Sequence, residues 1–200
     1  MVRRKRGDKS TLEGELYETI LMKSSYSFGL RGFDGTTMSE LACEAGVSKG
    51  SLYNLFQNKR TLFHQCFLYR IKTENDEIFL ASKSTSAPWS LETCLRLHLR
   101  LFSEKGSSFD LLQVSGALPG CAFEQTFYED RLLPAVKHCR SLLDSFDGAA
   151  DSIKSTEAVS TTLILSTLGL CLWSKVTGSG EFVDFPNSVL SATGCGSNRS

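Results

Sequence analysis

The sequence lacks a run of apolar residues long enough to cross a bilayer. Its longest stretch without a charge, residues 158–174, is interrupted by Ser160, Thr161, Thr162, Ser166, Thr167 and Gly169, whereas a bilayer span needs about 20 mostly apolar residues. We expect a buried helix there and no membrane partner. The basic start of the chain is followed at residues 7–10 by Gly-Asp-Lys-Ser, where a signal peptide would need an apolar core. The sequence therefore predicts a cytoplasmic protein.

Paired cysteine motifs are also absent. The chain has seven cysteines, at 43, 66, 94, 121, 139, 171 and 195, and no C-x-x-C pair. An odd number without paired spacing argues against a disulfide framework or a zinc knuckle. His64 lies near Cys66 and His138 adjoins Cys139, but neither pair has the spacing that closes a tetrahedral metal site. We expect no metal, no cofactor, and thiols that behave as small buried hydrophobes in a reducing cytosol.

The usual signatures of catalysis are missing as well. The sequence contains no G-x-S-x-G, no G-x-x-x-x-G-K and no H-E-x-x-H. Lys105, Asp110, Glu124 and Glu129 are scattered over faces expected to meet solvent. An enzyme is therefore not the expected class. What is present, 41% hydrophobic and 22% charged residues in a chain of 200, is the balance of a folded globular protein.

Net charge is zero over the whole chain but uneven along it. Residues 1–60 hold ten Lys or Arg and seven Asp or Glu, a net charge of +3, and residues 61–200 hold twelve and fifteen, a net charge of −3. Five of the N-terminal cations lie between Arg3 and Lys9. This distribution fits an N-terminal part that binds a polyanion, and it equally fits a solvated tail on an ordinary domain.

Capping residues and helical spacing predict helices along almost the whole chain. Four expected helix starts share a side chain that accepts a backbone hydrogen bond: Ser10, Thr37, Ser48 and Asn58. Two of them have the glutamate that completes a capping box: Glu13 and Glu40. Two glycines, Gly32 and Gly46, are expected to end the first two helices. The residues expected to face inward are Leu12, Leu16, Ile20, Leu21, Phe28, Leu41, Ala45, Leu62, Phe63, Cys66, Phe67 and Ile71.

The second and third helices are separated by only Gly46 and Val47, so they must cross steeply, as in a helix-turn-helix. The fourth helix, Lys59 to about Leu80, would span about 33 Å and could join two domains. A further helix is expected from Ser90, and its inward-facing residues would be Leu91, Cys94, Leu95, His98, Leu101 and Phe102. Four more helices are expected over 109–116, 122–146, 153–176 and 186–193, and Pro134 should kink the second of these.

We therefore predict an all-α protein. Its parts are a basic arm (1–9), a three-helix helix-turn-helix domain (10–58), a connecting helix (59–81), a second helical domain (82–193) and a tail (194–200).

The residue types around the turn have physical reasons. Ala42 is small where two helices cross, Gly46 supplies a positive φ, and Val47 is expected to bury itself beneath the turn. The following residues carry groups that reach base edges and phosphates: Ser48, Lys49, Gly50, Ser51, Tyr53 and Asn54. Helix starts at Thr37 and Lys59 add free amides that favour phosphate oxygens. The same geometry also occurs in proteins that never touch DNA, and Ser, Thr and Asn are ordinary caps.

Three runs of the sequence resemble the tetracycline-repressor (TetR) family of bacterial transcriptional regulators. They are Gly32-Phe33-Asp34-Gly35-Thr36-Thr37-Met38-Ser39-Glu40-Leu41-Ala42, Ala45-Gly46-Val47-Ser48-Lys49-Gly50-Ser51-Leu52-Tyr53, and Phe56 with Asn58-Lys59-Arg60-Thr61-Leu62-Phe63. The resemblance covers about residues 10–66, and it implies that 10–58 form a DNA-binding domain and that 82–193 form an effector-binding and dimerisation domain. The rest of the chain matches that family only in length and helical character.

The resemblance implies roles for individual residues. Thr37, Tyr53 and Lys59 would hold phosphates; Ser48, Lys49, Gly50, Ser51 and Asn54 would lie at or near the bases; Arg3, Arg4, Lys5 and Arg6 would form a minor-groove arm. The Tyr53 ring could instead pack on the first helix. Position 55, often a polar aromatic in the family, is Leu55 here. Either a phosphate contact is missing, or Leu55 touches a thymine methyl.

One short helix presents too few groups for a unique site, so we expect a homodimer on a palindromic operator. The apolar stripe Val159, Leu163, Leu168, Cys171 and Leu172 near Trp173 would form the interface, or would be buried within one subunit. A small-molecule effector would release the repressor from double-stranded DNA. Candidate pocket residues are His98, Phe102, Phe109, Phe123, Phe127, Tyr128 and Trp173, which could equally form plain core. A helical ligand-binding or scaffold protein is the alternative.

Overall fold

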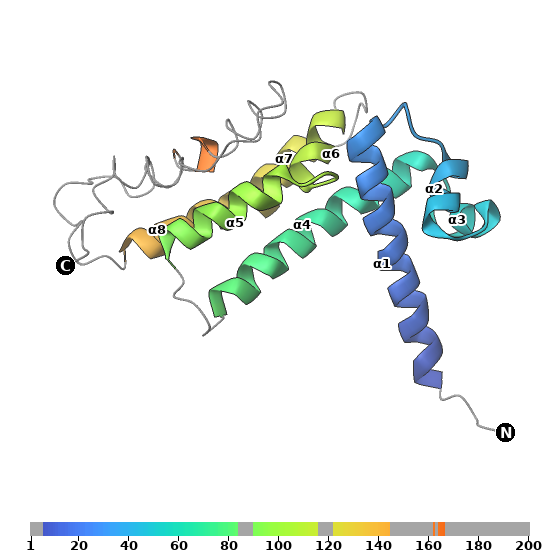
Figure 1. Cartoon of the computed structure of the whole chain (residues 1–200), viewed down its shortest axis with the longest axis horizontal. Coiled ribbons are helices and arrows are strands. Elements are labelled where there is room, and N and C mark those ends of the chain that lie inside the picture. The colour runs from blue at the N-terminus through green and yellow to red at the C-terminus, as the bar shows by residue number, and fades with distance from the viewer. Residues whose placement is uncertain (1–5, 84–89, 116–121, 145–161, 163, 167–200) are drawn as a thin grey trace. The chain divides into compact units, whose positions relative to one another are not determined.

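The structure is a computed structural model, and it describes residues 6–83, 90–115, 122–144, 162 and 164–166. Within these ranges every regular element is helical (Figure 1), in the order α1 (Arg6–Arg31), α2 (Met38–Ala45), α3 (Lys49–Phe56), α4 (Lys59–Lys83), α5 (Leu91–Ser103), α6 (Ser108–Ser115), α7 (Phe123–Phe127), the π-helical turn η1 (Tyr128–Leu132) and α8 (Leu133–Asp144). The all-α prediction is confirmed over the described residues. None of the helices in this part is long and apolar enough to cross a membrane.

Most of the predicted helix boundaries are confirmed. Thr37 forms a complete capping box with Glu40, and Ser48 accepts a hydrogen bond from the Ser51 amide. The amide of Thr61 donates to Asn58 Oδ1 at 2.9 Å, and that of Thr93 donates to Ser90 Oγ at 3.2 Å. Helices α1 and α2 end at glycines with positive φ, 75° at Gly32 and 74° at Gly46. The α4 helix continues three residues beyond the predicted Leu80, to Lys83.

The first helix differs from the prediction at its start. It begins at Arg6, so Ser10 lies inside it and Arg6 to Lys9 belong to a helix rather than to an arm. Leu16, predicted to face the core, is 44% exposed, whereas Ile20 and Phe28 are fully buried. Figure 1 shows that the N-terminal end of α1 extends past α2 and α3. The prediction for the start of the helix was therefore wrong, because a good local cap was overridden by continued helix.

The predicted long helix around Pro134 is broken into α7, η1 and α8. The break comes just before Pro134: the amide of Leu133 donates to the Tyr128 carbonyl, five residues back, which is a π-helical bond. Proline has no N–H to offer the carbonyl of Asp130, four residues earlier. The Asn75 side chain donates to that carbonyl instead, at 2.7 Å.

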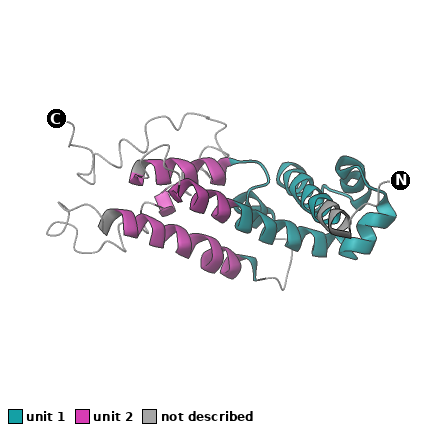
Figure 2. Cartoon of the chain, turned by 90° about the horizontal axis from the view of Figure 1, so that it is seen from below, with its two compact units in different colours: residues 1–73, 104–123 teal, residues 74–103, 124–200 magenta. Residues whose placement is uncertain are grey.

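Two compact units make up the chain (Figure 2). Unit 1 takes its described residues from 1–73 and 104–123, and unit 2 from 74–103 and 124–200. The helix α4 is continuous and contributes to both units. This division differs from the predicted boundaries 10–58, 59–81 and 82–193, because residues 104–123 pack with the N-terminal helices.

A close approach of two glycines explains why α6 belongs to unit 1. A Cβ added to Gly29 of α1 would lie 2.4 Å from the Gly106 backbone nitrogen, and a Cβ on Gly106 would lie 2.5 Å from the Ser25 carbonyl. Gly106 also has a φ of 71°, which other residues rarely adopt. Its amide donates to Asp110 Oδ2 at 3.0 Å, at the start of α6. Only residues without a side chain allow these two segments to touch.

The core of unit 1 is aromatic. The rings of Phe28 and Phe63 meet edge to face at a centroid distance of 5.0 Å, and Phe63 and Phe67 meet Phe123 at 5.6 and 5.0 Å. The other buried residues of α1 to α4 here include Ile20, Leu21, Leu41, Ala42, Ala45, Leu52, Phe56, Leu62 and Cys66. Ten of the residues predicted to face inward on these four helices are buried and Leu16 is exposed, while the side chain of Leu12 lies outside the described part of the chain. This core holds α2 and α3 rigidly on α1 and α4.

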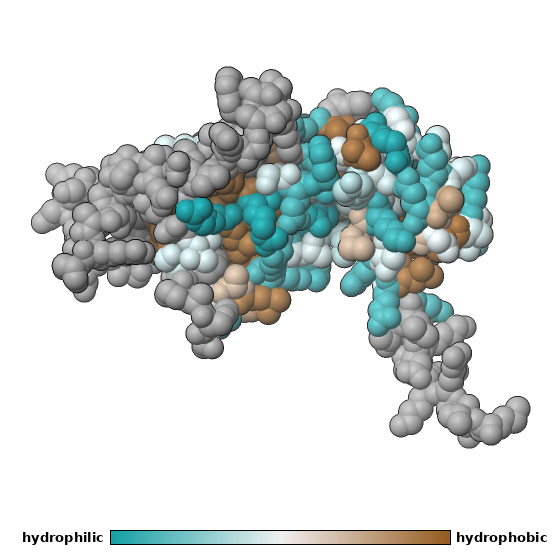
Figure 3. All heavy atoms as spheres, in the orientation of Figure 1, coloured by the Kyte–Doolittle hydropathy of each residue, from teal (hydrophilic) through white to brown (hydrophobic). Residues whose placement is uncertain are grey.

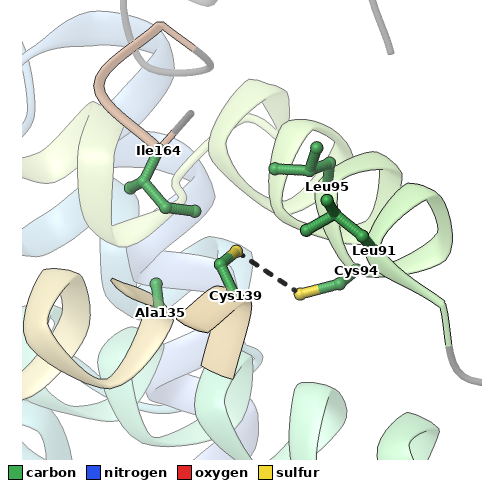
Figure 4. Packing of buried hydrophobic residues seen from close by; sticks show 6 residues of the cluster. All are labelled: Leu91, Cys94, Leu95, Ala135, Cys139 and Ile164. Atoms are coloured by element: carbon green, nitrogen blue, oxygen red, sulfur yellow. Dashed lines mark hydrogen bonds between the residues drawn. The ribbon is translucent and has the colours of Figure 1, made fainter. Parts of the chain in front are cut away.

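Unit 2 has an aliphatic cluster between α5 and α8 (Figure 4). Leu91, Cys94 and Leu95 of α5 pack against Ala135 and Cys139 of α8, with Ile164 beside them. The sulfur atoms of Cys94 and Cys139 are 3.9 Å apart, and both side chains are fully buried. Contact with the Cys94 thiol and burial raise the pKa of Cys139, so the Cys139 thiol stays protonated.

Three of the four described cysteines confirm the prediction of buried thiols: Cys66, Cys94 and Cys139. Burial raises the pKa of Cys66 to about 12, and its thiol donates to the Leu21 carbonyl. Cys43 is exposed, so the prediction was wrong there; it lies on the outer side of the short α2 helix. Cys121, Cys171 and Cys195 lie outside the described residues. Among those described, no group of three His, Cys, Asp or Glu could hold a metal ion.

Candidate DNA-binding surface

The turn between α2 and α3 is built by two backbone hydrogen bonds. The amide of Gly46 donates to the Cys43 carbonyl at 3.1 Å, and that of Val47 donates to the Ala42 carbonyl at 2.9 Å. Both bonds need the left-handed conformation of Gly46 (φ 74°, ψ 28°), which allows a helix to end within one residue. Val47 is half-buried rather than fully covered. α3 therefore begins at Lys49, four residues after α2 ends.

The inner face of α3 fixes its position. Leu52 and Phe56 are buried, and the Phe56 ring stacks on Tyr17 of α1 at a centroid distance of 5.1 Å. Phe56, not Tyr53, thus makes the aromatic contact with the first helix. Tyr53, three residues earlier on α3, is 41% exposed. Among the described residues, Tyr53 makes no ring contact with α1.

The outer face of α3 is polar and open. Lys49, Gly50 and Asn54 are exposed, and no hydrogen bond or ion pair in the described part of the chain occupies the side chains of Lys49, Tyr53 or Asn54. Ser48 and Ser51 are exposed too, but they bond each other: the Ser51 amide donates to Ser48 Oγ at 3.0 Å, and the two hydroxyls are 2.8 Å apart. The predicted residues of α3 therefore do come together on one surface.

Gly50 has no reason within the described fold to lack a side chain. A Cβ built there would meet only Ser48 Oγ, at 3.8 Å, which is ordinary contact. Its φ is not in the left-handed region. A glycine in the first turn of a helix lowers helix stability, so its presence favours a surface that another molecule approaches closely. Leu55 beside this surface is 47% exposed.

Thr37 is on the surface, but its hydroxyl is already engaged. It accepts from the Glu40 amide at 3.2 Å and donates to Glu40 Oε2 at 2.8 Å. Hydrogen bonds from the Thr37 side chain and backbone lower the pKa of Glu40, which stays ionised. A phosphate at this helix start would therefore meet backbone amides rather than the Thr37 hydroxyl.

Lys59 is half-buried in unit 1, and its ammonium is bonded there. Its ammonium donates to the carbonyls of Phe33 at 2.8 Å and Thr36 at 3.1 Å, and lies 4.1 Å from the centroid of the Phe33 ring. One of its three N–H groups is left for a phosphate. The main role of Lys59 in the structure is to tie the segment before α2 to the start of α4, a role that the sequence prediction did not include.

The remaining predicted sites divide between the units or fall outside the described residues. Phe102 and Phe127 are buried in unit 2 with ring centroids 6.3 Å apart, and His98 stacks on Phe102 at 5.9 Å. Phe123 belongs instead to the aromatic core of unit 1. Phe109 is buried and Tyr128 is 55% exposed. Arg3, Arg4, Lys5, Val159, Leu163, Leu168, Cys171, Leu172 and Trp173 lie outside the described residues.

A surface groove in unit 1 contains none of the predicted effector residues. It has a volume of about 460 Å³ and is lined by Met22, Lys23, Tyr26, Ser27, Arg31 and Glu44. Arg31 and Glu44 form an ion pair at 2.9 Å across it. The face drawn in Figure 3 is mostly hydrophilic where residues are described, with small separate hydrophobic areas.

Sequence reasoning missed three buried charged residues. Asp110, expected on a solvent face, is 6% exposed because it accepts from the Gly106 amide in the core of unit 1. Arg131 and Glu74 are buried in unit 2, where Arg131 Nε donates to Glu74 Oε2 at 2.9 Å. A signal was present: Arg131 falls in a series of residues four apart, otherwise apolar, with Phe127, Ala135 and Cys139. A charged residue at the centre of such a series indicates a buried, paired charge.

Two short helices, a left-handed turn and an exposed polar face on the second helix together define a helix-turn-helix protein. Residues 20–66 match the sequence model of the bacterial regulatory proteins of the tetR family. This match places the helix-turn-helix segment of the chain in the tetR family.

Known proteins are similar to this chain over different lengths. The HTH-type transcriptional repressor BepR of Brucella suis biovar 1 is 34% identical over 74 residues, 37% of this chain and 35% of that protein. The chain thus matches about a third of the length of this curated relative. A tetR-family protein from Mesorhizobium loti has a TM-score of 0.65 at 20% identity and covers 90% of this chain and 93% of its own.

A second solved structure, AibR in complex with isovaleryl coenzyme A and operator DNA, has a TM-score of 0.59 at 18% identity. It covers 88% of this chain and 95% of its own. At these identities the likeness extends to the fold along most of the chain and no further.

Proposed function

We propose that the protein is a sequence-specific DNA-binding transcriptional regulator, a ligand-released repressor that acts in the cytoplasm without catalytic activity. The observation that carries the proposal is the outer face of α3, where Lys49, Gly50, Tyr53 and Asn54 lie exposed on a rigidly packed helix. A helix of this width enters the major groove, and ammonium, amide and phenol groups reach base edges and phosphates there. The match of residues 20–66 to the tetR family supports it.

The short length of α3 favours a homodimer. Eight residues present too few polar groups to specify one site in a genome. Two copies related by a two-fold axis would read the halves of a palindrome about 34–36 Å apart. The stripe of Val159, Leu163, Leu168 and Leu172 is our proposal for the surface that joins them.

The dimer interface is tested by Leu168→Glu. A charge in an apolar interface between copies should shift the protein from two-chain to one-chain mass in sedimentation velocity at micromolar concentration. Phe79→Glu is the control, because Phe79 is 58% exposed in the structure. Two-chain mass in a folded Leu168→Glu variant would rule out this stripe as the interface.

A small-molecule effector would act through α4. This helix runs without a break from Lys59, in unit 1, into unit 2 at Glu74. A ligand that favours one position of the unit 2 residues of α4 would bias the position of its unit 1 residues, and would move two half-site readers out of register. AibR, a protein of similar fold, was solved in complex with both isovaleryl coenzyme A and operator DNA, so one protein of this fold has a site for each kind of partner.

DNA binding is tested by a salt series with the full chain and random duplex, measured by fluorescence anisotropy. A dimer that neutralises several phosphates should give a log–log slope of several units, since each phosphate contributes about −0.9. Selection of bound fragments from genomic DNA then defines the operator. Asn54→Ala should change the preference at one or two base pairs, by about 1–3 kcal/mol each. Failure to bind any duplex at low salt would leave a helical scaffold or ligand-binding protein as the remaining interpretation.

A further inference from the structure

Three ionisable side chains from three helices meet in the interior of unit 2. Glu74 of α4, His98 of α5 and Arg131 of η1 are 1%, 0% and 0% exposed. Arg131 Nε donates to Glu74 Oε2 at 2.9 Å, and Arg131 Nη1 lies 3.3 Å from His98 Nδ1. The guanidinium carbon is 4.5 Å from the centroid of the Phe102 ring. Burying such groups is unfavourable unless each finds a partner.

The contact with Arg131 determines the protonation of His98. A guanidinium only donates hydrogen bonds, so the Nδ1 atom facing it must be the acceptor of the imidazole ring. Burial, the Arg131 charge and His138 on α8 lower the pKa of His98 well below its ordinary value, so the ring is neutral. Its one proton is therefore on Nε2, and Nε2 is a donor.

Two donors of the cluster remain without an acceptor in the described part of the chain. His98 Nε2 and Arg131 Nη2 are buried, and neither has a hydrogen-bond partner among the described residues. Both side chains are completely buried, so these N–H groups are withdrawn from bulk water. Buried donors are nearly always satisfied in native proteins, and each exception calls for an explanation.

The backbone is irregular at the position that places Arg131 here. Phe127, Arg131, Ala135 and Cys139 are all buried, at intervals of four residues. In a regular α-helix, residues four apart are rotated by about 40°, so such a series would wind off one face. The π-helical turn of η1 takes up more residues per turn and keeps the series aligned. Turns of this kind are frequent at functional sites.

The charges of the cluster balance without any further ion. Arg131 carries one positive charge and Glu74 one negative charge, and His98 is neutral. A carboxylate ligand would therefore bring a negative charge with no counterpart in the cluster, which is unfavourable in a dry interior. An uncharged oxygen acceptor would satisfy both donors at no such cost.

Resting on the proposed function, we infer that His98 and Arg131 anchor the effector through an uncharged carbonyl oxygen. The ligand class is a ketone, ester or amide with an apolar remainder, because the rings of Phe102 and Phe127 border the cluster. Glu74 holds the Arg131 guanidinium in place and does not contact the ligand.

The test uses a panel of uncharged C8–C12 ketones, methyl esters and primary amides, each paired with its free acid and its hydrocarbon. Binding to the full-length protein is measured at pH 7.5 by isothermal titration calorimetry. At least one carbonyl compound should bind tenfold or more tightly than both of its partners. A panel in which acids or hydrocarbons bind as well as carbonyl compounds would overturn the inference.

Two variants assign the carbonyl contact to its residues. His98→Phe keeps the ring stacked on Phe102 but removes the Nε2 donor, and should weaken carbonyl binding at least tenfold while the hydrocarbon is unaffected. His64→Phe, in unit 1, is the matched control and should bind like wild type. Arg131→Leu alone would remove the Arg131 hydrogen bond from the buried Glu74 carboxylate. The role of Arg131 is therefore tested in the double variant Glu74→Gln/Arg131→Gln, whose fold is checked by circular dichroism. Unchanged carbonyl binding in folded variants would overturn the inference.

The same samples separate this inference from the proposed function. DNA binding is measured in parallel at low salt, on random duplex and on genomic fragments offered to the wild-type protein. Carbonyl binding lost in His98→Phe, with no duplex bound by the wild type, would support the anchor and refute the regulator. Binding of a duplex by the wild type, without any preference for carbonyl compounds, would support the regulator and refute the anchor.

Discussion

Gly50 offers the sharpest test of the DNA-binding surface at the scale of a single residue. A Cβ fits there, so Gly50→Ala should leave the free energy of unfolding unchanged or raise it by up to about 1 kcal/mol. If the α3 backbone approaches DNA closely, the added methyl should weaken operator binding by about tenfold, equivalent to about 1.4 kcal/mol. Urea unfolding and fluorescence anisotropy measure the two effects.

Gly14 is the matched control for this substitution. It lies in α1, and a Cβ added there would have no atom of the described residues within 4 Å, so Gly14→Ala should gain helix stability and bind DNA like wild type. Unaltered DNA affinity of Gly50→Ala would show that nothing approaches α3 at this point.

Lys59 is expected to act on stability as well as on binding. Lys59→Ala removes the donor from the carbonyls of Phe33 and Thr36, so unfolding should become easier by about 1 kcal/mol or more. Binding to all sequences should weaken alike, because the start of α2 is no longer tied to α4 and one phosphate donor is lost. Lys105→Ala, at an exposed position of unit 1, is the control for stability. Loss of sequence discrimination with full affinity for random duplex would contradict this role.

At the scale of elements, the contact between α1 and α6 is the one most sensitive to volume. Gly29→Ala places a methyl group 2.4 Å from the Gly106 nitrogen, and backbone atoms cannot rotate away. We expect the substitution to destabilise unit 1 by about 1–3 kcal/mol, although alanine is the better helix former. Urea unfolding of Gly29→Ala beside Gly14→Ala measures the difference. Equal stability of the two variants would mean that α6 moves aside at little cost.

At the scale of the whole molecule, the buried imidazole of His98 makes stability depend on pH. Its pKa is lowered in the folded state by burial and by Arg131, and Glu74 and His138 are the other titratable groups near it. The unfolded chain therefore binds more protons below pH 6.5, and stability is full above that pH and falls as the pH decreases. For His98 alone we expect a loss of about 1.4 kcal/mol between pH 7.5 and 5.5.

Urea unfolding at pH 7.5, 6.5 and 5.5 measures this loss, and His98→Phe should remove most of it. His138, whose pKa is lowered by burial as well, accounts for a smaller remainder. The same pH dependence in the His98→Phe variant would assign the effect to other groups.

The sequence by itself determined the helix-turn-helix. Its signals are local: a cap at Thr37 or Ser48 bonds an amide three residues on, and Gly46 supplies its own backbone conformation. Such interactions are read from neighbouring letters. The start of α1 was predicted wrongly because a cap residue such as Ser10 is also tolerated inside a helix. Only the surrounding chain decides which role it takes.

Tertiary structure alone decided which polar groups are used within the fold. Lys59 bonds a carbonyl 26 residues away, and Arg131 pairs with a carboxylate 57 residues away. The π-helical turn that brings Arg131 inward depends on Asn75 from another helix. These partners meet only when helices pack, because burial removes the competing water and makes each unpaired donor costly. The residues that we propose to read DNA were thus visible in the sequence, and the buried anchor for an effector became visible only in the fold.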